Sequence, residues 1–96
     1  MTTGSVEDRQ LLALREKIDL IDGELFKLFA DRMAIVRQIG ALKQEYGLPL
    51  KDPVREAVLK TRLKDSAADV LEPRHVEQLA RAIIEISRDI QEETNT

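Results

Sequence analysis

Apolar residues recur at steps of three and four through the first half of the chain, the period that keeps them on one face of an α-helix. The pattern predicts a first helix from about Leu11 to Tyr46. Gly47 is a natural C-cap for this helix, and Pro49 stops it two residues later. The apolar positions within it are Leu14, Ile18, Ile21, Leu25, Leu28, Ile35, Ile39 and Leu42.

Helical periodicity also dominates the second half, because β-branched residues occur singly and no apolar/polar alternation lasts. Asp52 and Pro53 fit the N-cap and the first position of a second helix over about 53–65. A third helix is predicted to begin near Pro73 and to end at about Glu92. We therefore expect an all-α fold of three helices with a very long first helix.

The first helix is too long for a domain of this size. Its 36 residues, at about 1.5 Å each, make a rod of roughly 54 Å. A compact domain of 96 residues is only about 30 Å across. Because the apolar stripe continues to the end of the rod, something outside the chain must cover it. A second copy is the simplest cover, which predicts an intertwined helical homodimer.

One position of the first helix breaks its apolar stripe. The series 28, 32, 35, 39, 42 and 46 places Arg32 where an apolar residue is expected, with Lys43 beside its far end. These two cations are 11 residues apart, so they point the same way about 16 Å apart. In the third helix a hydroxyl and an amide extend an apolar stripe, which runs through Ala80, Ile84, Ser87 and Gln91.

Each of these side chains also has a purely structural explanation. Arg32 could extend along the surface or pair with an acid, and Lys43 suits the negative end of the helix dipole. The start of the second helix adds Arg55 and Glu56, of which the carboxylate is favourable in a first helical turn. Ser87 could bond a carbonyl of its own helix. These explanations do not say why three helices each place polar groups on the face that should be core. The coincidence indicates a pocket for a small di-anion that carries a hydroxyl.

Composition excludes most other kinds of site. The chain has 96 residues, 43% of them hydrophobic, which predicts a single domain over 1–96 with an ordered core at about 10–92 and frayed ends. The absence of cysteine excludes disulfides and thiolate catalysis and suits a reducing cytoplasm. A net charge of -3 and only 3% aromatic residues argue against a nucleic-acid partner.

Membrane, metal and covalent chemistry are not expected either. The start MTTGSVEDRQ is polar and acidic, so we expect no signal peptide, and no run approaches the roughly 18 apolar residues of a membrane span. Asp19, Asp22 and Glu24 have no histidine nearby, which argues against a metal site. There is no nucleophile–base pair and no phosphate loop. Shape and electrostatics alone suit a rearrangement or elimination within one molecule.

Four stretches, in this order and spacing, resemble the all-helical chorismate mutase family: LLALREKID, RMAIVRQIGALK, PLKDPVRE and IIEISRDIQ. The resemblance covers about residues 11–91. It implies an intertwined dimer of three-helix chains with two equivalent active sites, each borrowing an arginine from the partner. It also implies conversion of chorismate to prephenate by a Claisen rearrangement, on the route to phenylalanine and tyrosine, without a cofactor.

The resemblance implies a role for each matching residue. Arg15 resembles the arginine lent to the other subunit's site, and the cationic cage around the substrate carboxylates corresponds to Arg32, Lys43 and Arg55. Lys43 and Gln91 resemble the two donors to the ether oxygen. The remaining substrate contacts correspond to Asp52, Glu56 and Ser87, of which Glu56 would accept from the ring hydroxyl.

The spacing along the first helix agrees with a shared site. Arg15 lies 28 residues from Lys43, roughly 42 Å along one rod, so the two meet only if two rods run antiparallel.

Two other functions remain open. One is an isochorismate pyruvate-lyase on the same fold. The presence of Glu56 directly after Arg55 argues against this function. The other is a non-catalytic helical dimerisation or regulatory module, which would leave the polar positions without a purpose.

Overall fold

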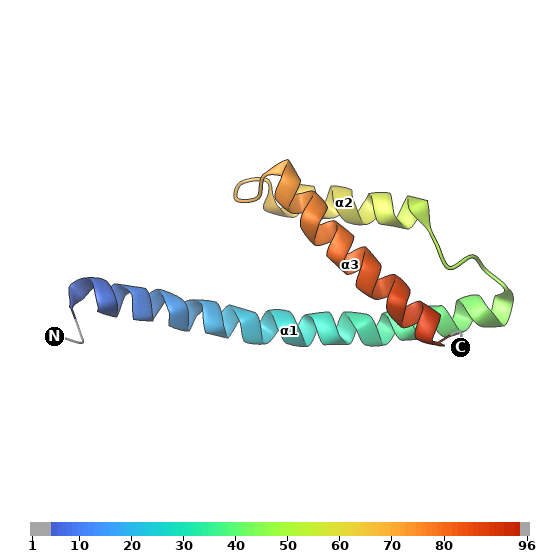
Figure 1. Cartoon of the computed structure of the whole chain (residues 1–96), viewed down its shortest axis with the longest axis horizontal. Helices are drawn as coiled ribbons and strands as arrows, with labels where there is room; N and C mark the ends of the chain where they lie inside the picture. Colours follow the sequence, from blue (N-terminus) through green and yellow to red (C-terminus); the bar gives the residue numbers. More distant parts are fainter. Residues whose placement is uncertain (1–4, 95–96) are drawn as a thin grey trace. The chain divides into compact units, whose positions relative to one another are not determined.

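The computed structural model describes residues 5–94, which form three α-helices in the order α1 (Val6–Tyr46), α2 (Pro53–Ala67) and α3 (Pro73–Thr94) (Figure 1). No strand occurs in this part of the chain, so the all-α prediction is confirmed. The first helix begins five residues earlier than predicted, and the second and third each end two residues later. None of the helices described is long and apolar enough to cross a membrane.

The C-terminus of α1 is closed by a Schellman motif. Gly47 has a positive φ of 66°, a conformation that glycine adopts without strain. The Leu48 N–H donates to the Lys43 carbonyl at 2.8 Å, and the Gly47 N–H donates to the Gln44 carbonyl at 3.4 Å. The motif therefore ends the helix at Gly47, one turn after Lys43, and its bond to the Lys43 carbonyl holds the backbone of that residue.

The N-terminus of α2 has the predicted cap. The side-chain Oδ1 of Asp52 accepts from the Arg55 N–H at 3.0 Å, and Pro53 occupies the first helical position. The first intrahelical bond runs from the Glu56 N–H to the Asp52 carbonyl at 3.0 Å. Because the cap sets where the first turn begins, it also determines the direction in which Glu56 leaves the helix.

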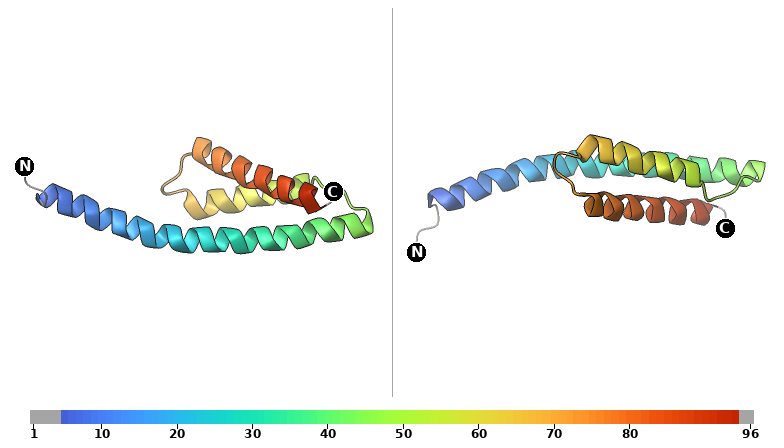
Figure 2. Two further views of the ribbon diagram at one scale, coloured as in Figure 1. Left: turned by 60° about the horizontal axis from the view of Figure 1, so that its bottom comes forward. Right: turned by 90° about the horizontal axis from the view of Figure 1, so that it is seen from above.

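The chain forms two compact units, Met1–Arg32 and Met33–Thr96. In the second unit α2 and α3 run antiparallel and pack against each other (Figure 2). The predicted stripe of α3 is confirmed, since Ala80 is 0% exposed and Ser87 and Gln91 are also buried. The buried positions on the part of α1 that belongs to this unit are Met33, Val36 and Gly40.

The face of α1 that is buried within a single chain differs from the predicted stripe, which was expected to need a second copy to cover it. The predicted stripe is exposed at Ile35, Ile39 and Leu42, whereas the face one residue further along is buried. The reason is Gly40, because its missing side chain lets α3 approach the backbone of α1 on that face. Arg32, expected to be buried in the stripe, is only half-buried.

In the first unit, α1 carries a long exposed apolar stripe. Its residues, at the predicted helical spacing, are Leu11, Leu14, Ile18, Ile21, Leu25 and Leu28. The exposed fraction of Leu28, for example, is 66%. Contiguous apolar surface of this kind marks a site of interaction with another molecule.

Candidate functional site

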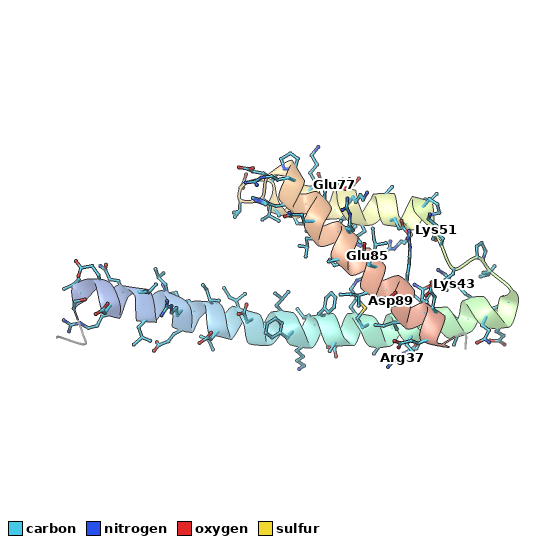
Figure 3. The ribbon with its side chains drawn as sticks, viewed as in Figure 1. Arg37, Lys43, Lys51, Glu77, Glu85 and Asp89 are labelled. Atoms are coloured by element: carbon cyan, nitrogen blue, oxygen red, sulfur yellow. The ribbon has the colours of Figure 1, made fainter. Side chains whose placement is uncertain are left out.

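Lys43 extends from the last turns of α1 toward α3 and is half-buried (Figure 3). Its Nζ donates to the Leu50 carbonyl at 2.7 Å and to the Gln91 Oε1 at 2.8 Å. An ammonium group has three N–H donors, so one remains for another acceptor. The Schellman motif, the loop carbonyl and Gln91 together hold this cation in one place.

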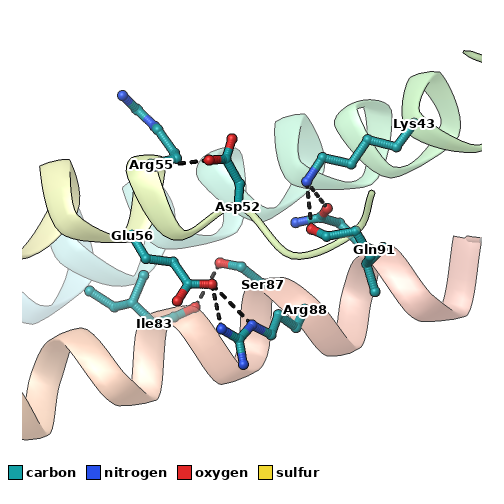
Figure 4. A network of polar contacts seen from close by, with 9 residues as sticks. Lys43, Asp52, Arg55, Glu56, Ile83, Ser87, Arg88 and Gln91 are labelled. Carbon is teal, nitrogen blue, oxygen red and sulfur yellow. Dashed lines mark hydrogen bonds and ion pairs between the residues drawn. The ribbon is translucent and has the colours of Figure 1, made fainter. Parts of the chain in front are cut away.

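Gln91 is the partner of Lys43 on α3, and its side chain lies between the two helices (Figure 4). The residue is only 8% exposed. Because the Oε1 atom accepts from the Lys43 ammonium, the Nε2 amide group of Gln91 is the part left to donate. The pair thus presents an N–H of each residue, one charged and one neutral, at the same place.

Gly40 allows this pair to form. A Cβ atom placed on Gly40 would lie 3.0 Å from the Gln91 Cα and 3.3 Å from its Cβ. A side chain at position 40 would therefore push the backbone of α3 away from α1. The 2.8 Å contact between Lys43 and Gln91 depends on the two backbones being this close.

The N-cap and the first turn of α2 supply the two carboxylates near these donors. Asp52 is exposed and caps the helix, and the Arg55 side chain points away from Glu56 and Lys43 in Figure 4. Glu56 is half-buried, and its Oε2 accepts from two N–H groups of Arg88 on α3. The distances are 3.1 Å from Nε and 2.5 Å from Nη2.

Arg88 is the residue of this cluster that sequence reasoning missed. Arginines at 74, 81 and 88 recur every seven residues, which places them along one edge of α3 and gives the pattern of a solvated charged edge. No signal in the sequence separates Arg88 from that edge, because its partner, the half-buried carboxylate of Glu56, comes within reach only when α2 packs against α3.

Ser87 is buried between α3 and α1. Its Oγ donates to the Ile83 carbonyl of its own helix at 2.6 Å and lies 3.9 Å from the Met33 Sδ. The structural explanation for this hydroxyl, a bond within its helix, is therefore confirmed. A role in binding a substrate carboxylate stays a prediction.

Arg15 and Arg32 belong to the other unit of the chain. Arg15 is exposed on α1, and Arg32 is half-buried on the same helix. Their proposed roles as substrate contacts also stay predictions. The structure thus brings together Lys43 and Gln91 directly and links Glu56 to the same stretch of α3 through Arg88.

The arrangement can bind an anion and donate hydrogen bonds to a developing negative charge. A fixed ammonium and a buried amide supply the donors, and the carboxylate of Glu56 supplies an acceptor. Among residues 5–94 there is no group of three or more histidine, cysteine or acidic side chains that could hold a metal ion.

Comparisons with known proteins agree with this chemistry. The family model of chorismate mutase type II matches residues 14–92. The chain is 38% identical over 76 residues to the T-protein of Enterobacter agglomerans, covering 78% of this chain and 20% of that protein. It is 34% identical over 55 residues to the chorismate mutase of Methanocaldococcus jannaschii, covering 57% of this chain and 56% of that protein.

A third relative is the bifunctional chorismate mutase/prephenate dehydratase of Escherichia coli (strain K12), 36% identical over 81 residues. The match covers 83% of this chain but only 21% of that protein, so the chain spans a fraction of the length of the relatives it matches. No solved structure matches the chain significantly. Because the family model matches most of the sequence, this chain belongs to the chorismate mutase type II family.

Proposed function

We propose that this chain catalyses the Claisen rearrangement of chorismate to prephenate in the biosynthesis of phenylalanine and tyrosine. The observation that carries the proposal is the contact between Lys43 and Gln91, which gathers two donors at one point. Membership of the chorismate mutase type II family supports the same reaction. The cluster supplies binding and electrostatics, and the reaction needs no more than these.

The mechanism follows from the donors. Holding the enolpyruvyl group of chorismate over the ring selects the reactive conformer, which lowers the entropic part of the barrier. As the carbon–oxygen bond breaks, negative charge grows on the ether oxygen. The third N–H of Lys43 and the amide of Gln91 would meet that charge without having to reorganise.

The other substrate contacts complete the proposal. Glu56 would accept from the ring hydroxyl, and the two substrate carboxylates would be held by Arg32, Arg55, Ser87 and the Arg15 of a second copy. A single domain assembled as a homodimer accounts for the exposed apolar stripe of α1, which a second copy would cover. A chain without cysteine suits a reducing cytoplasm.

The test is to incubate the purified protein with chorismate, follow the loss of its ultraviolet absorbance and identify the product. Prephenate supports the proposal. Lys43→Ala should lower kcat about 10²–10³-fold, the usual loss when one preorganised donor is removed. Lys64→Ala is the matched control, because Lys64 is exposed in the last turn of α2 and should leave the rate unchanged.

Two results would overturn the proposal. Chorismate that stays intact, with the protein folded, would favour a non-catalytic dimerisation or regulatory module. Release of pyruvate from isochorismate, without prephenate from chorismate, would identify a pyruvate-lyase on the same fold.

A further inference from the structure

The contact between Glu56 and Arg88 is asymmetric. Both N–H groups of Arg88 that reach Glu56, from Nε and from Nη2, donate to the same oxygen, Oε2. Arginine and carboxylate groups often pair side by side, with one N–H on each oxygen. Here that second contact is absent, so the Oε1 atom of Glu56 accepts no hydrogen bond from the residues that the structure describes.

The pair is more protected from water than an ordinary surface ion pair. The side chains of Arg88 and Glu56 are 33% and 24% exposed, whereas those of Lys60 and Glu77, on the same two helices, are 44% and 56% exposed. A partly buried pair holds its geometry better than an exposed one, which solvent and side-chain freedom weaken. Arg88 also lies three residues before Gln91 on α3, so the pair ties the first turn of α2 to the donor end of the site.

Charge gives the contact a second consequence. A site for a di-anion should not contain an uncompensated carboxylate, because like charges repel at short range. Arg88 offsets the charge of Glu56 without using the oxygen that a substrate hydroxyl would need. A neutral residue at position 88 would leave that repulsion in place.

We propose that Arg88 is a positioning residue of the substrate site: it holds Glu56 through Oε2 and leaves Oε1 to accept from the ring hydroxyl of the substrate. Arg88 itself need not touch the substrate. The proposal rests on the function proposed above, and it names a residue that sets specificity for the hydroxyl.

The experiment compares Arg88→Met, Arg88→Lys, Glu56→Gln and the double variant Arg88→Met/Glu56→Gln. The substrates are chorismate and its methyl ether at the ring hydroxyl, which cannot donate a hydrogen bond. Arg88→Met should lower kcat/KM for chorismate about 10–100-fold and should reduce the preference for chorismate over the methyl ether as much as Glu56→Gln does. Arg88→Lys should recover part of the preference, because it restores the charge.

The double variant separates positioning from other roles. If Arg88 acts through Glu56, then Arg88→Met should change kcat/KM less than threefold in the Glu56→Gln background. Arg81→Met is the control, since Arg81 is exposed on the same edge of α3 two turns earlier and should match the wild type. Circular dichroism checks that each variant is folded. If Arg88→Met fails to fold, the preference for chorismate over the methyl ether is compared between Arg88→Lys and the isosteric Glu56→Gln.

Three results would overturn the inference. The first is an Arg88→Met protein with wild-type activity and preference, and the second is a full loss from Arg88→Met in the Glu56→Gln background. The third result matters if Arg88→Met does not fold. In that case the inference fails if the preference of Arg88→Lys for chorismate over the methyl ether is no greater than that of Glu56→Gln. A folded wild-type protein that leaves chorismate unchanged would instead overturn the proposed function, and the inference with it.

Discussion

At the scale of single residues, the Lys43–Gln91 contact determines how the site should respond to pH. An amide donates its hydrogen bond at every pH, whereas a glutamate in its place donates only when protonated. Histidine is the side chain whose reference pKa lies between 5 and 8, and the one histidine, His75, accepts from the Glu72 N–H at the start of α3. We therefore expect kcat/KM of the wild type to be nearly flat from pH 5 to 8.

The Gln91→Glu variant should be active at low pH and should lose activity as pH rises through the pKa of the introduced carboxyl. Burial raises that pKa, and the Lys43 ammonium 2.8 Å from the present Oε1 lowers it. The fold should persist at high pH, because the ionised carboxylate would pair with Lys43. The measurement is a pH–rate profile of both proteins with chorismate, with folding checked at each pH. If the activity of the variant did not change with pH, Gln91 would not be a hydrogen-bond donor to the ether oxygen.

Gln91 could be predicted from the sequence because it extends an apolar stripe, and Lys43 because it lies beside the end of another. Arg88 could not, because a charged residue on the edge of a helix is what a solvated surface also requires. Its importance depends on the facing element, since only the packing of α2 against α3 brings Glu56 within its reach. Periodicity reports which face of a helix a residue occupies, but not which partner lies opposite.

At the scale of helices, the closest approach is at Gly40. Gly40→Ala would gain about 1 kcal/mol of helix propensity but would lose about 1–3 kcal/mol to overpacking, because the new Cβ would meet the Gln91 backbone at 3.0 Å. We expect a net loss of stability and a larger loss of kcat/KM, measured by urea unfolding and by initial rates. Ala41→Gly, at an exposed position in the same turn, measures the propensity alone. A more stable and fully active Gly40→Ala protein would contradict the packing described here.

Asp52 combines a cap with a proposed substrate contact, and two substitutions separate these roles. Asp52→Ala should destabilise the protein by about 1 kcal/mol, because the Arg55 N–H loses its acceptor. Asp52→Asn keeps an acceptor for the cap, so its stability should stay close to that of the wild type. Thermal unfolding gives the stability, and kcat/KM of the Asn variant then reports the carboxylate alone. Equal stability of the Ala and Asn variants would show that the cap contributes little.

The end of α1 and the start of α2 were predictable because they depend on local chemistry. Gly47 and Asp52 make the bonds expected of a C-cap and an N-cap within a few residues of chain. The face of α1 that packs within the chain was not predicted, and it lies one residue away from the stripe that was. Two apolar faces compete on that helix, and the choice depends on where α3 can approach, which no local pattern encodes.

At the scale of the whole molecule, the proposed shared site predicts complementation between inactive variants. Arg15→Ala would remove the arginine that we propose is lent to the partner, and Lys43→Ala would remove a proposed donor of the chain's own site. Each protein alone should be nearly inactive. After subunit exchange of an equal mixture, about a quarter of all sites should be intact, because half the dimers are mixed and each has one good site.

Exchange is verified by mass spectrometry of differently tagged copies, and the recovered rate is compared with the wild type. A mixture of two Lys43→Ala proteins carrying the two tags is the control and should stay inactive. Proven exchange without recovery would contradict the shared site.

The exposed apolar stripe of α1 also has a kinetic consequence. The contacts within each helix are local in sequence, so helices should form rapidly and at a rate independent of protein concentration. A second copy can cover the stripe only after two chains collide. Recovery of activity from denaturant should therefore be second order in protein, and it should lag behind recovery of the helical signal by an interval that lengthens as the solution is diluted.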